Sequence, residues 1–173
     1  AITPSPDGRH FLDVHSTIAS APVALVRDAD GRQVAELGRA DLTRLQAAGW
    51  VAPEAFTVKA RDGKTDLHGQ MFKPSHFDPA KKYPIVTYIY PGPQVGSVRS
   101  RSFQSAHLDH QALAELGFVV IAVDGMGTPL RSKSFQDAWY GDMADNTLPD
   151  QVAALKQLGE RHPWIDTGRA GIW

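Results

Sequence analysis

From about residue 51 onward the sequence predicts an open, mostly parallel sheet of the α/β class, preceded by part of an all-β domain. Segments of strand and helix character alternate between positions 84 and 173. The segment "FVVIAVD" at 118–124 is almost entirely apolar, which is typical of a parallel strand covered on both faces. The first 50 residues instead consist mainly of short strand-like segments separated by turns. Length and pattern therefore indicate the end of one domain joined to the start of another.

The N-terminal region is predicted to form strands at 10–16, 22–28 and 32–37. A short amphipathic helix is expected over 39–50, because Leu42, Leu45 and Ala48 recur at helical spacing. Gly49 stands where such a helix would end. The first 50 residues therefore have the pattern of a small meander, which is also the pattern of one unit cut from a repeating β architecture.

A β-hairpin is predicted next, because Phe56 and Val58 alternate on one side of a tight turn and Leu67 and Met71 on the other. The remaining elements are expected as strand 84–90, helix 105–117, strand 118–124, helix 145–162 and a final strand that begins at 169. The inward faces of the two helices are predicted from apolar spacing: Leu108, Ala112, Leu113 and Leu116 in the first, and Val152, Leu155 and Leu158 in the second.

Composition narrows the classes of function. The chain has 173 residues, 42% hydrophobic and 21% charged, with a net charge of -1. It has no basic stripe that would track phosphates and no apolar run long enough to span a bilayer, so neither nucleic-acid binding nor membrane insertion is expected. With no cysteine, disulfides, thiolate nucleophiles and cysteine-ligated metals are excluded.

Functional groups of open α/β sheets gather at the carboxyl ends of strands. At the first such end, "YIYPGPQVGS", two prolines and a glycine follow Tyr90 and predict a rigid loop. Two interpretations of Tyr90 stay open at this point. It is either a packed strand tyrosine with a satisfied hydroxyl, or a hydroxyl donor directed at a developing oxyanion.

The second strand end carries a glycine-containing loop, "VDGMGTPLRSKSF". A dinucleotide fingerprint needs three glycines in the order G-x-G-x-x-G, and only Gly125 and Gly127 match, because Leu130 occupies the third position. A nucleotide cofactor is therefore not expected. His107 and His110 lie three residues apart on a predicted helix, but no third ligand is evident, so we expect a solvated helix surface and no metal.

Several segments together resemble the bacterial dipeptidyl peptidase IV branch of the prolyl oligopeptidase family. They are "SPDGRHFLDVHSTIASAPVALVRDADG", "DGKTDLHGQMFKPSHFDPAKKYPIV", "YPGPQ", "VDGMGTP" and "DQVAALKQLGERHPWIDTGRAGIW". The resemblance covers essentially the whole chain. It implies that residues 1–50 are the last strands of a β-propeller and its connection, and that 51–173 are the N-terminal part of an α/β-hydrolase domain with a mostly parallel sheet.

The resemblance also implies a reaction and a site. Such enzymes are serine exopeptidases that release N-terminal dipeptides with proline or alanine at the second position, and Tyr90 matches the family's oxyanion-hole tyrosine. The triad order Ser, Asp, His and the G-x-S-x-G elbow after the strand "RAGIW" imply that all three members lie beyond Trp173. The chain is therefore expected to be an interior fragment, cut before the nucleophile elbow and inactive alone.

Further expectations follow from the resemblance. It implies peptide substrates, homodimerisation and a periplasmic location whose export signal would lie outside this fragment. Met126 stands where relatives usually have arginine and Leu130 where glycine is frequent, so Arg131 is our candidate to anchor the loop instead. Two alternative functions stay open: a non-catalytic binding module and a hydrolase of esters or acylated peptides.

Overall fold

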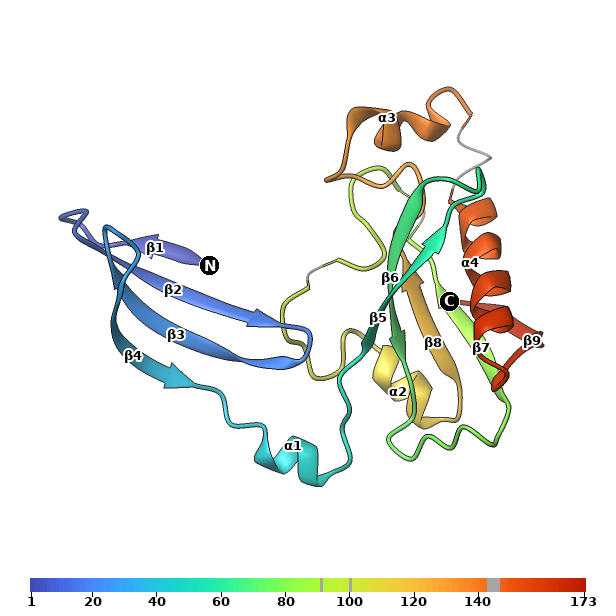
Figure 1. The fold of residues 1–173 in the computed structure, drawn as a ribbon, viewed down its shortest axis with the longest axis horizontal. Helices are drawn as coiled ribbons and strands as arrows, with labels where there is room; N and C mark the ends of the chain where they lie inside the picture. The colour runs from blue at the N-terminus through green and yellow to red at the C-terminus, as the bar shows by residue number, and fades with distance from the viewer. Residues whose placement is uncertain (91, 100, 143–146) are drawn as a thin grey trace. The chain divides into compact units, whose positions relative to one another are not determined.

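The computed structural model describes residues 1–90, 92–99, 101–142 and 147–173 (Figure 1). The chain divides into two compact units. The first consists of Ala1–Ala52 and a short segment that includes residues 101–105. The second consists of Pro53–Arg99 and Ala106–Trp173. Each unit has its own sheet, so each is described by itself.

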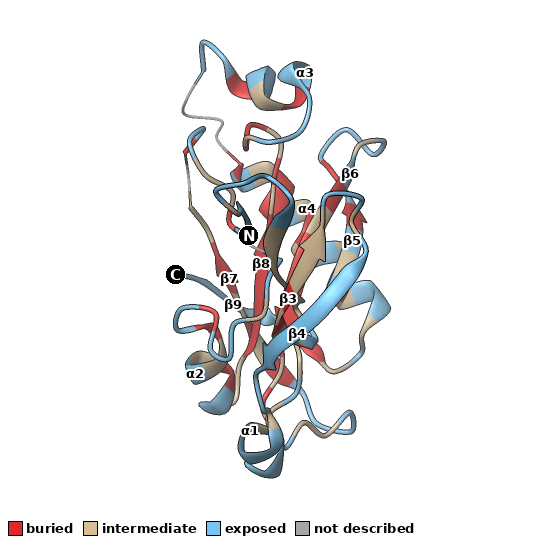
Figure 2. Cartoon of the chain, turned by 90° about the vertical axis from the view of Figure 1, so that its left-hand side faces the viewer, coloured by how far each residue is buried: buried red, intermediate tan, exposed pale blue. Residues whose placement is uncertain are grey.

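The first unit is a four-stranded antiparallel meander in the order β1-β2-β3-β4. Its elements are β1 (Ile2–Pro4), β2 (His10–Thr17), β3 (Ser20–Asp28), β4 (Gln33–Arg39) and the short helix α1 (Thr43–Ala47). The three strands and the helix expected from the sequence are thereby confirmed. β4 is exposed along its whole length, in contrast to β3, where Val23 and Leu25 are buried (Figure 2).

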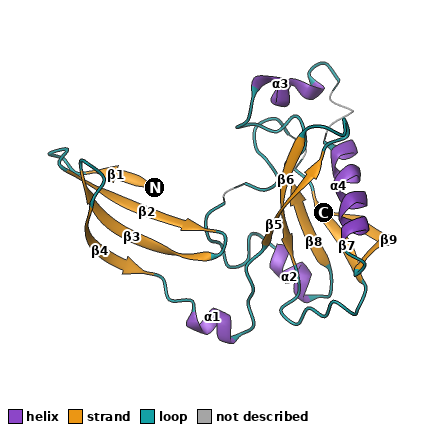
Figure 3. Ribbon diagram, in the orientation of Figure 1, coloured by secondary structure: helices purple, strands orange, loops and turns teal. Residues whose placement is uncertain are grey.

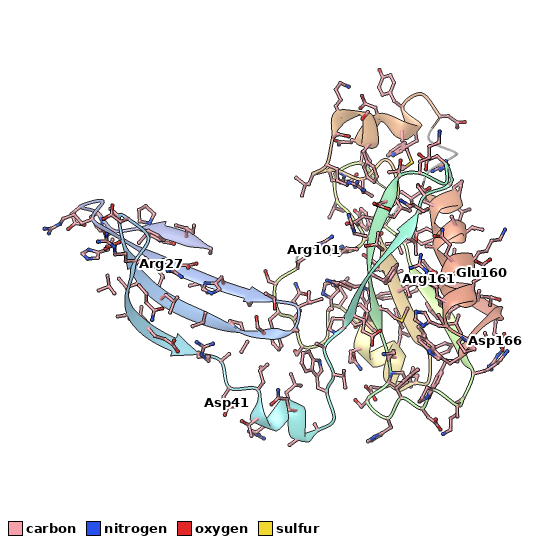
Figure 4. All side chains as sticks on the ribbon, viewed as in Figure 1. Arg27, Asp41, Arg101, Glu160, Arg161 and Asp166 are labelled. Carbon is pink, nitrogen blue, oxygen red and sulfur yellow. The ribbon has the colours of Figure 1, made fainter. Side chains whose placement is uncertain are left out.

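An ion pair between strands and a segment from later in the chain, residues 101–105, add further contacts to this unit. The Arg27 Nε donates to the Asp13 carboxylate at 2.8 Å between β3 and β2 (Figure 4). In the returning segment, the Phe103 N–H donates to Ser16 Oγ at 2.9 Å. Trp50 Nε1 donates to the Ser105 carbonyl at 2.8 Å. The segment 101–105 is therefore part of the first unit although its neighbours in sequence belong to the second.

The second unit is a five-stranded mixed sheet in the order β5-β6-β8-β7-β9, with helices on both faces (Figure 3). Its strands are β5 (Glu54–Lys59), β6 (Asp66–Phe72), β7 (Tyr83–Tyr88), β8 (Val119–Val123) and β9 (Ile165–Ile172). Its helices are α2 (His110–Glu115), α3 (Lys133–Gln136), the 3-10 turn η1 (Asp137–Trp139) and α4 (Leu148–Arg161). β8-β7 and β7-β9 pair in parallel, while β5-β6 and β6-β8 are antiparallel.

β8 is the centre of this sheet, and all five of its residues are fully buried. Val119, Ile121 and Val123 face the core cluster that includes Leu158 of α4. Val120 faces the opposite way, into the cluster that includes Ala114 of α2. This alternation confirms the prediction that "FVVIAVD" forms a strand covered on both faces. The predicted parallel pairing holds for β7 only, because β6 pairs with β8 antiparallel. The predicted hairpin is also confirmed as the antiparallel pair β5-β6.

The predicted inward faces of the helices are wrong in part. α2 begins only at His110, because His107 and Leu108 adopt left-handed backbone conformations with φ of 47° and 60°. Leu113 packs against the core as expected, but the buried residues of α2 are His110 and Ala114. Leu108, Ala112 and Leu116 are exposed. In α4, Leu158 is buried and Leu155 packs against the core as expected, but Val152 is 43% exposed. Its place on the inward face is taken by Asp150, Gln151 and Ala154.

Candidate active site

The ends of β7 and β9 lie side by side in the second unit. The Trp173 N–H donates to the Thr87 carbonyl and the Ile89 N–H donates to the Trp173 carbonyl, both at 3.1 Å. Parallel pairing makes the two strands end at the same edge of the sheet. Tyr90, which follows β7, therefore lies at the same sheet edge as Trp173.

Tyr90 lies two residues beyond the end of β7 and is half-buried. Its ring packs against a small cluster of Tyr88, Val98 and Ala122. Its hydroxyl accepts a hydrogen bond from Gln94 Nε2 at 3.3 Å, and Gln94 is exposed. The fold thus holds the Tyr90 ring in place, while a substrate could displace exposed Gln94 from the Tyr90 hydroxyl. Pro91 of the predicted rigid loop lies outside the described residues.

The loop that follows Tyr90 is fixed from its far end. The Tyr90 N–H donates to Ser97 Oγ at 3.2 Å. The Val98 N–H donates to Asp124 Oδ1 at 2.9 Å, so the last residue of the segment "FVVIAVD" holds the loop. A Cβ added at Gly96 would lie 2.4 Å from the same oxygen, which leaves no room for a side chain. These contacts hold Val98, at the far end of the loop, in the cluster that packs against the Tyr90 ring.

Beneath this strand end lies an aromatic cage of Phe72, Tyr88, His107, His110 and Trp173. The His110 ring centroid lies 4.7 Å from that of Tyr88 and 5.5 Å from that of Trp173, so it touches the side chains of both strand ends. His110 is fully buried and His107 is 3% exposed. The expectation of a solvated helix surface is therefore wrong, because the left-handed turn at His107 directs both imidazoles inward.

Burial keeps these two imidazoles neutral. It lowers the pKa of His110 from 6.5 to about 4, assisted by the neighbouring His107 and the Arg99 guanidinium. The pKa of His107 is also lowered, mainly by burial and against the effect of a hydrogen bond to the Val98 backbone. Neither ring nitrogen of His110 has a hydrogen-bond partner among the described residues. The cage therefore provides aromatic contact to the strand ends without a charge of its own.

The loop after β8 is held by a buried carboxylate. Asp150 of α4 is fully buried; its Oδ1 accepts from the Arg61 N–H at 2.9 Å and from Arg61 Nε at 3.2 Å. Its Oδ2 accepts from the Met126 N–H at 2.7 Å and from Arg61 Nη2 at 3.3 Å. One carboxylate thus joins the β5-β6 turn, α4 and the loop that opens at Gly125. No local pattern in the sequence predicts this group.

The glycines of this loop have a packing role. Gly127 has φ of 105°, and a Cβ there would lie 1.5 Å from Trp139 Nε1. The space that a phosphate would need at a G-x-G turn is thus filled by an indole ring. Leu130 also has a left-handed backbone, with φ of 71°, which glycine would adopt without steric cost. Leu130, which stands where glycine is frequent in relatives, therefore occupies a position with a strained backbone.

Arg131, our candidate to replace the missing arginine, lies beside Leu130. Its Nη1 donates to the Asp66 carbonyl at 2.6 Å. Its guanidinium carbon lies 4.1 Å from the centroid of the Phe135 ring. The Met126 side chain packs instead against the hydrophobic core. Arg131 thus contacts β6 and the Phe135 ring, and its role as an anchor of this loop stays a prediction.

Within the described ranges, no group of three or more His, Asp or Glu residues has a geometry that would hold a metal ion. No helix in the described part of the chain is long and apolar enough to cross a membrane.

The comparison with known proteins is consistent across sequence and structure. Residues 104–173 match the model of the prolyl oligopeptidase family. Human dipeptidyl peptidase 8 is 37% identical over 134 residues, which cover 75% of this chain and 15% of the relative. A dipeptidyl-aminopeptidase B from Aspergillus niger is 35% identical over 101 residues, 58% of this chain and 11% of the relative. The chain belongs to the prolyl oligopeptidase family.

Solved structures of this family extend the match to the whole chain. Porphyromonas gingivalis dipeptidyl peptidase 4 superposes with a TM-score of 0.80 at 26% identity, over 100% of this chain and 24% of that one. A Bacteroides ovatus protein assigned as a dipeptidyl aminopeptidase IV gives 0.84 at 30% identity, over 99% and 24%. The chain thus spans about a quarter or less of the length of these relatives.

Proposed function

We propose that the protein containing this segment is a serine exopeptidase that releases N-terminal dipeptides from peptides, with proline or alanine at the second position. Its first 50 residues would then be the last strands of a β-propeller, and 51–173 the N-terminal part of an α/β-hydrolase domain. The support is the named relatives, which are dipeptidyl peptidases. Peptides are its substrates in this proposal, and a homodimer is its assembly by family resemblance.

The observation that carries the proposal is the pairing of β7 with β9 at the Tyr90 end. The Ile89 N–H bonds to the Trp173 carbonyl, so a nucleophile turn that follows Trp173 begins beside Tyr90. In an α/β hydrolase the serine stands on such a turn directly after its strand. The Tyr90 hydroxyl and a backbone N–H after the serine are then within reach of one carbonyl oxygen.

The proposed reaction assigns one step to this segment. The serine oxygen attacks the carbonyl carbon of the second residue, a histidine accepts the serine proton, and an aspartate orients that histidine. As the carbonyl oxygen becomes negative, the Tyr90 hydroxyl donates a hydrogen bond to it. Gln94, the described donor to that hydroxyl, leaves the phenolic proton free for this role because it uses only a lone pair of the oxygen.

The test replaces Tyr90 with phenylalanine in the intact protein and measures release of p-nitroaniline from Ala-Pro-p-nitroanilide. We expect kcat to fall by about 10²–10³, the cost of losing one oxyanion donor. Folding should survive, since the hydroxyl is bonded only to exposed Gln94 in the described part of the chain.

The reaction should also require a free substrate amine. Cleavage of Ala-Pro-p-nitroanilide but not of its N-acetylated form would therefore support an exopeptidase, whereas cleavage of the acetylated form would indicate a hydrolase of acylated peptides.

Tyr83, at the other end of β7, provides the matched control. Its hydroxyl accepts from the Asp78 N–H at 2.8 Å, a bond within the fold. Tyr83→Phe should lower the melting temperature and leave kcat close to that of the wild type. If the two variants lose kcat equally, Tyr90 has no special role. If the intact protein releases no dipeptide, the proposed activity is wrong.

A further inference from the structure

Arg99 occupies an unusual place beside the proposed catalytic hydroxyl. It is exposed, at the end of the loop that starts at Tyr90. Its Nη2 donates to the Tyr88 hydroxyl at 3.2 Å, and its guanidinium carbon lies 5.7 Å from the centroid of the Tyr90 ring. Its backbone is left-handed, with φ of 56°. A strained non-glycine residue of this kind is kept where the surrounding structure requires it, often at a functional site.

The charge of Arg99 has no acidic partner among the described residues. This distinguishes it from the arginines that form ion pairs, which are Arg9, Arg27, Arg32, Arg39, Arg61 and Arg169. The two imidazoles nearest to it are buried and kept neutral, partly by its own charge. A guanidinium has five N–H donors, and the Tyr88 hydroxyl occupies one site. The remaining donors are available to an anion from solvent.

Resting on the proposed function, we propose that Arg99 is a specificity-determining residue that receives the C-terminal carboxylate of the leaving peptide. A substrate of an aminopeptidase has a cationic amine on one side of the scissile bond and, when short, a carboxylate on the other. The Arg99 guanidinium repels the amine and attracts the carboxylate. The preferred substrates are then tripeptides and tetrapeptides with a free C-terminus, because their carboxylate lies close to the scissile bond.

The same contacts would also allow Arg99 a purely structural role, in which it only positions the Tyr90 ring. A guanidinium packed on the Tyr90 ring also holds that ring in place by a cation–π contact. Such support would act on every substrate, whatever its C-terminus. Recognition of a carboxylate acts only on substrates that have one. The two roles therefore separate when the C-terminal charge alone is changed.

The experiment compares Ala-Pro-Ala with its C-terminal amide as substrates of the intact protein. We expect wild-type kcat/KM to favour the free acid by roughly tenfold, mostly through KM, as for one charge-assisted contact. Arg99→Gln should reduce that ratio to about one, and Arg99→Lys should retain part of it because the charge remains. Arg101→Gln, which removes an exposed arginine charge two residues further along the chain (labelled in Figure 4), is the matched control and should keep the ratio.

Each result decides for or against Arg99. If Arg99→Gln lowers kcat/KM for acid and amide equally, Arg99 only supports the Tyr90 ring and the inference is wrong. If the wild type cleaves neither peptide, the proposed function fails, and calorimetric titration with the same two peptides then tests Arg99 directly. Tighter binding of the acid that is lost in Arg99→Gln would support the site, and equal or undetectable binding of both peptides would overturn it.

Discussion

The carboxyl ends of β7 and β8 are neighbours in one sheet, yet they are built in opposite ways. After β8, the loop is tied to a buried carboxylate, because Asp150 binds both the Met126 N–H and Arg61. After β7, the Ser97 hydroxyl is used by the fold, but two polar groups remain available: the Tyr90 hydroxyl meets exposed Gln94, and Arg99 has no acidic partner among the described residues. Polar groups that the fold uses fully therefore support the site, whereas the available ones are the candidates for chemistry.

Removing the buried carboxylate should be the largest single perturbation of this arrangement. Asp150→Ala removes the carboxylate that accepts hydrogen bonds from the Arg61 guanidinium and the Met126 N–H. Breaking a buried charge pair in this way costs about 3–5 kcal/mol of unfolding free energy. Urea denaturation of the intact protein, followed by tryptophan fluorescence, measures the loss.

Asp166 is the matched control, since it is also an aspartate paired with an arginine in the same unit. Its partner Arg169 lies at 2.8 Å, but their side chains are 29% and 57% exposed. Asp166→Ala should cost only about 0–1 kcal/mol, as for other surface ion pairs. Equal losses in the two variants would mean that the loop after β8 does not depend on Asp150.

Part of this comparison was predictable from the sequence. The continuous apolar run of β8 and the strand–helix alternation indicated the parallel β8-β7-β9 core, and with it the strand end that carries Tyr90. These features depend on local composition and period, which a sequence displays directly.

The features of the site that the sequence did not predict depend on contacts between positions far apart in the chain, or on unusual backbone conformations. Arg61 and Asp150 are separated by 89 residues, and no local pattern pairs them. The burial of His110 follows from left-handed backbone at His107 and Leu108, positions where apolar periodicity instead favours continued helix. A sequence clue existed in the polar pair Asp150-Gln151 on the otherwise apolar side of α4, since buried polar residues are usually bonded.

The neutral cage between the two strand ends predicts a dependence of stability on pH. The pKa of folded His110 lies at about 4, below its ordinary 6.5, so the folded protein resists a proton that the unfolded chain accepts. Its contribution is fully present above pH 6.5 and is lost as the pH falls toward 4. Within that window the unfolding free energy should decrease by up to about 1.4 kcal/mol per pH unit for each such histidine.

The groups that face His110 are His107, the Arg99 guanidinium and the Tyr88 hydroxyl, together with the uncharged rings of Phe72 and Trp173. His110→Phe keeps a ring in the cage and removes its proton site, so the slope between pH 6.5 and 4 should flatten. Replacing exposed His76 with glutamine removes an imidazole outside the cage and serves as control. An unchanged slope in His110→Phe would show that His110 does not contribute to acid sensitivity.

The smallest expected effect concerns Arg131, which links the loop after β8 to β6. Arg131→Ala removes the hydrogen bond to the Asp66 carbonyl and the contact with the Phe135 ring. For a contact of this kind at an exposed site we expect a loss of about 0.5–1 kcal/mol. The Gly127 N–H, which donates to the Phe135 carbonyl at 2.8 Å, should then exchange with deuterium several-fold faster. Unchanged exchange and unchanged activity of the intact protein would mean that Arg131 does not compensate for the arginine replaced by Met126, and that Asp150 holds the loop without it.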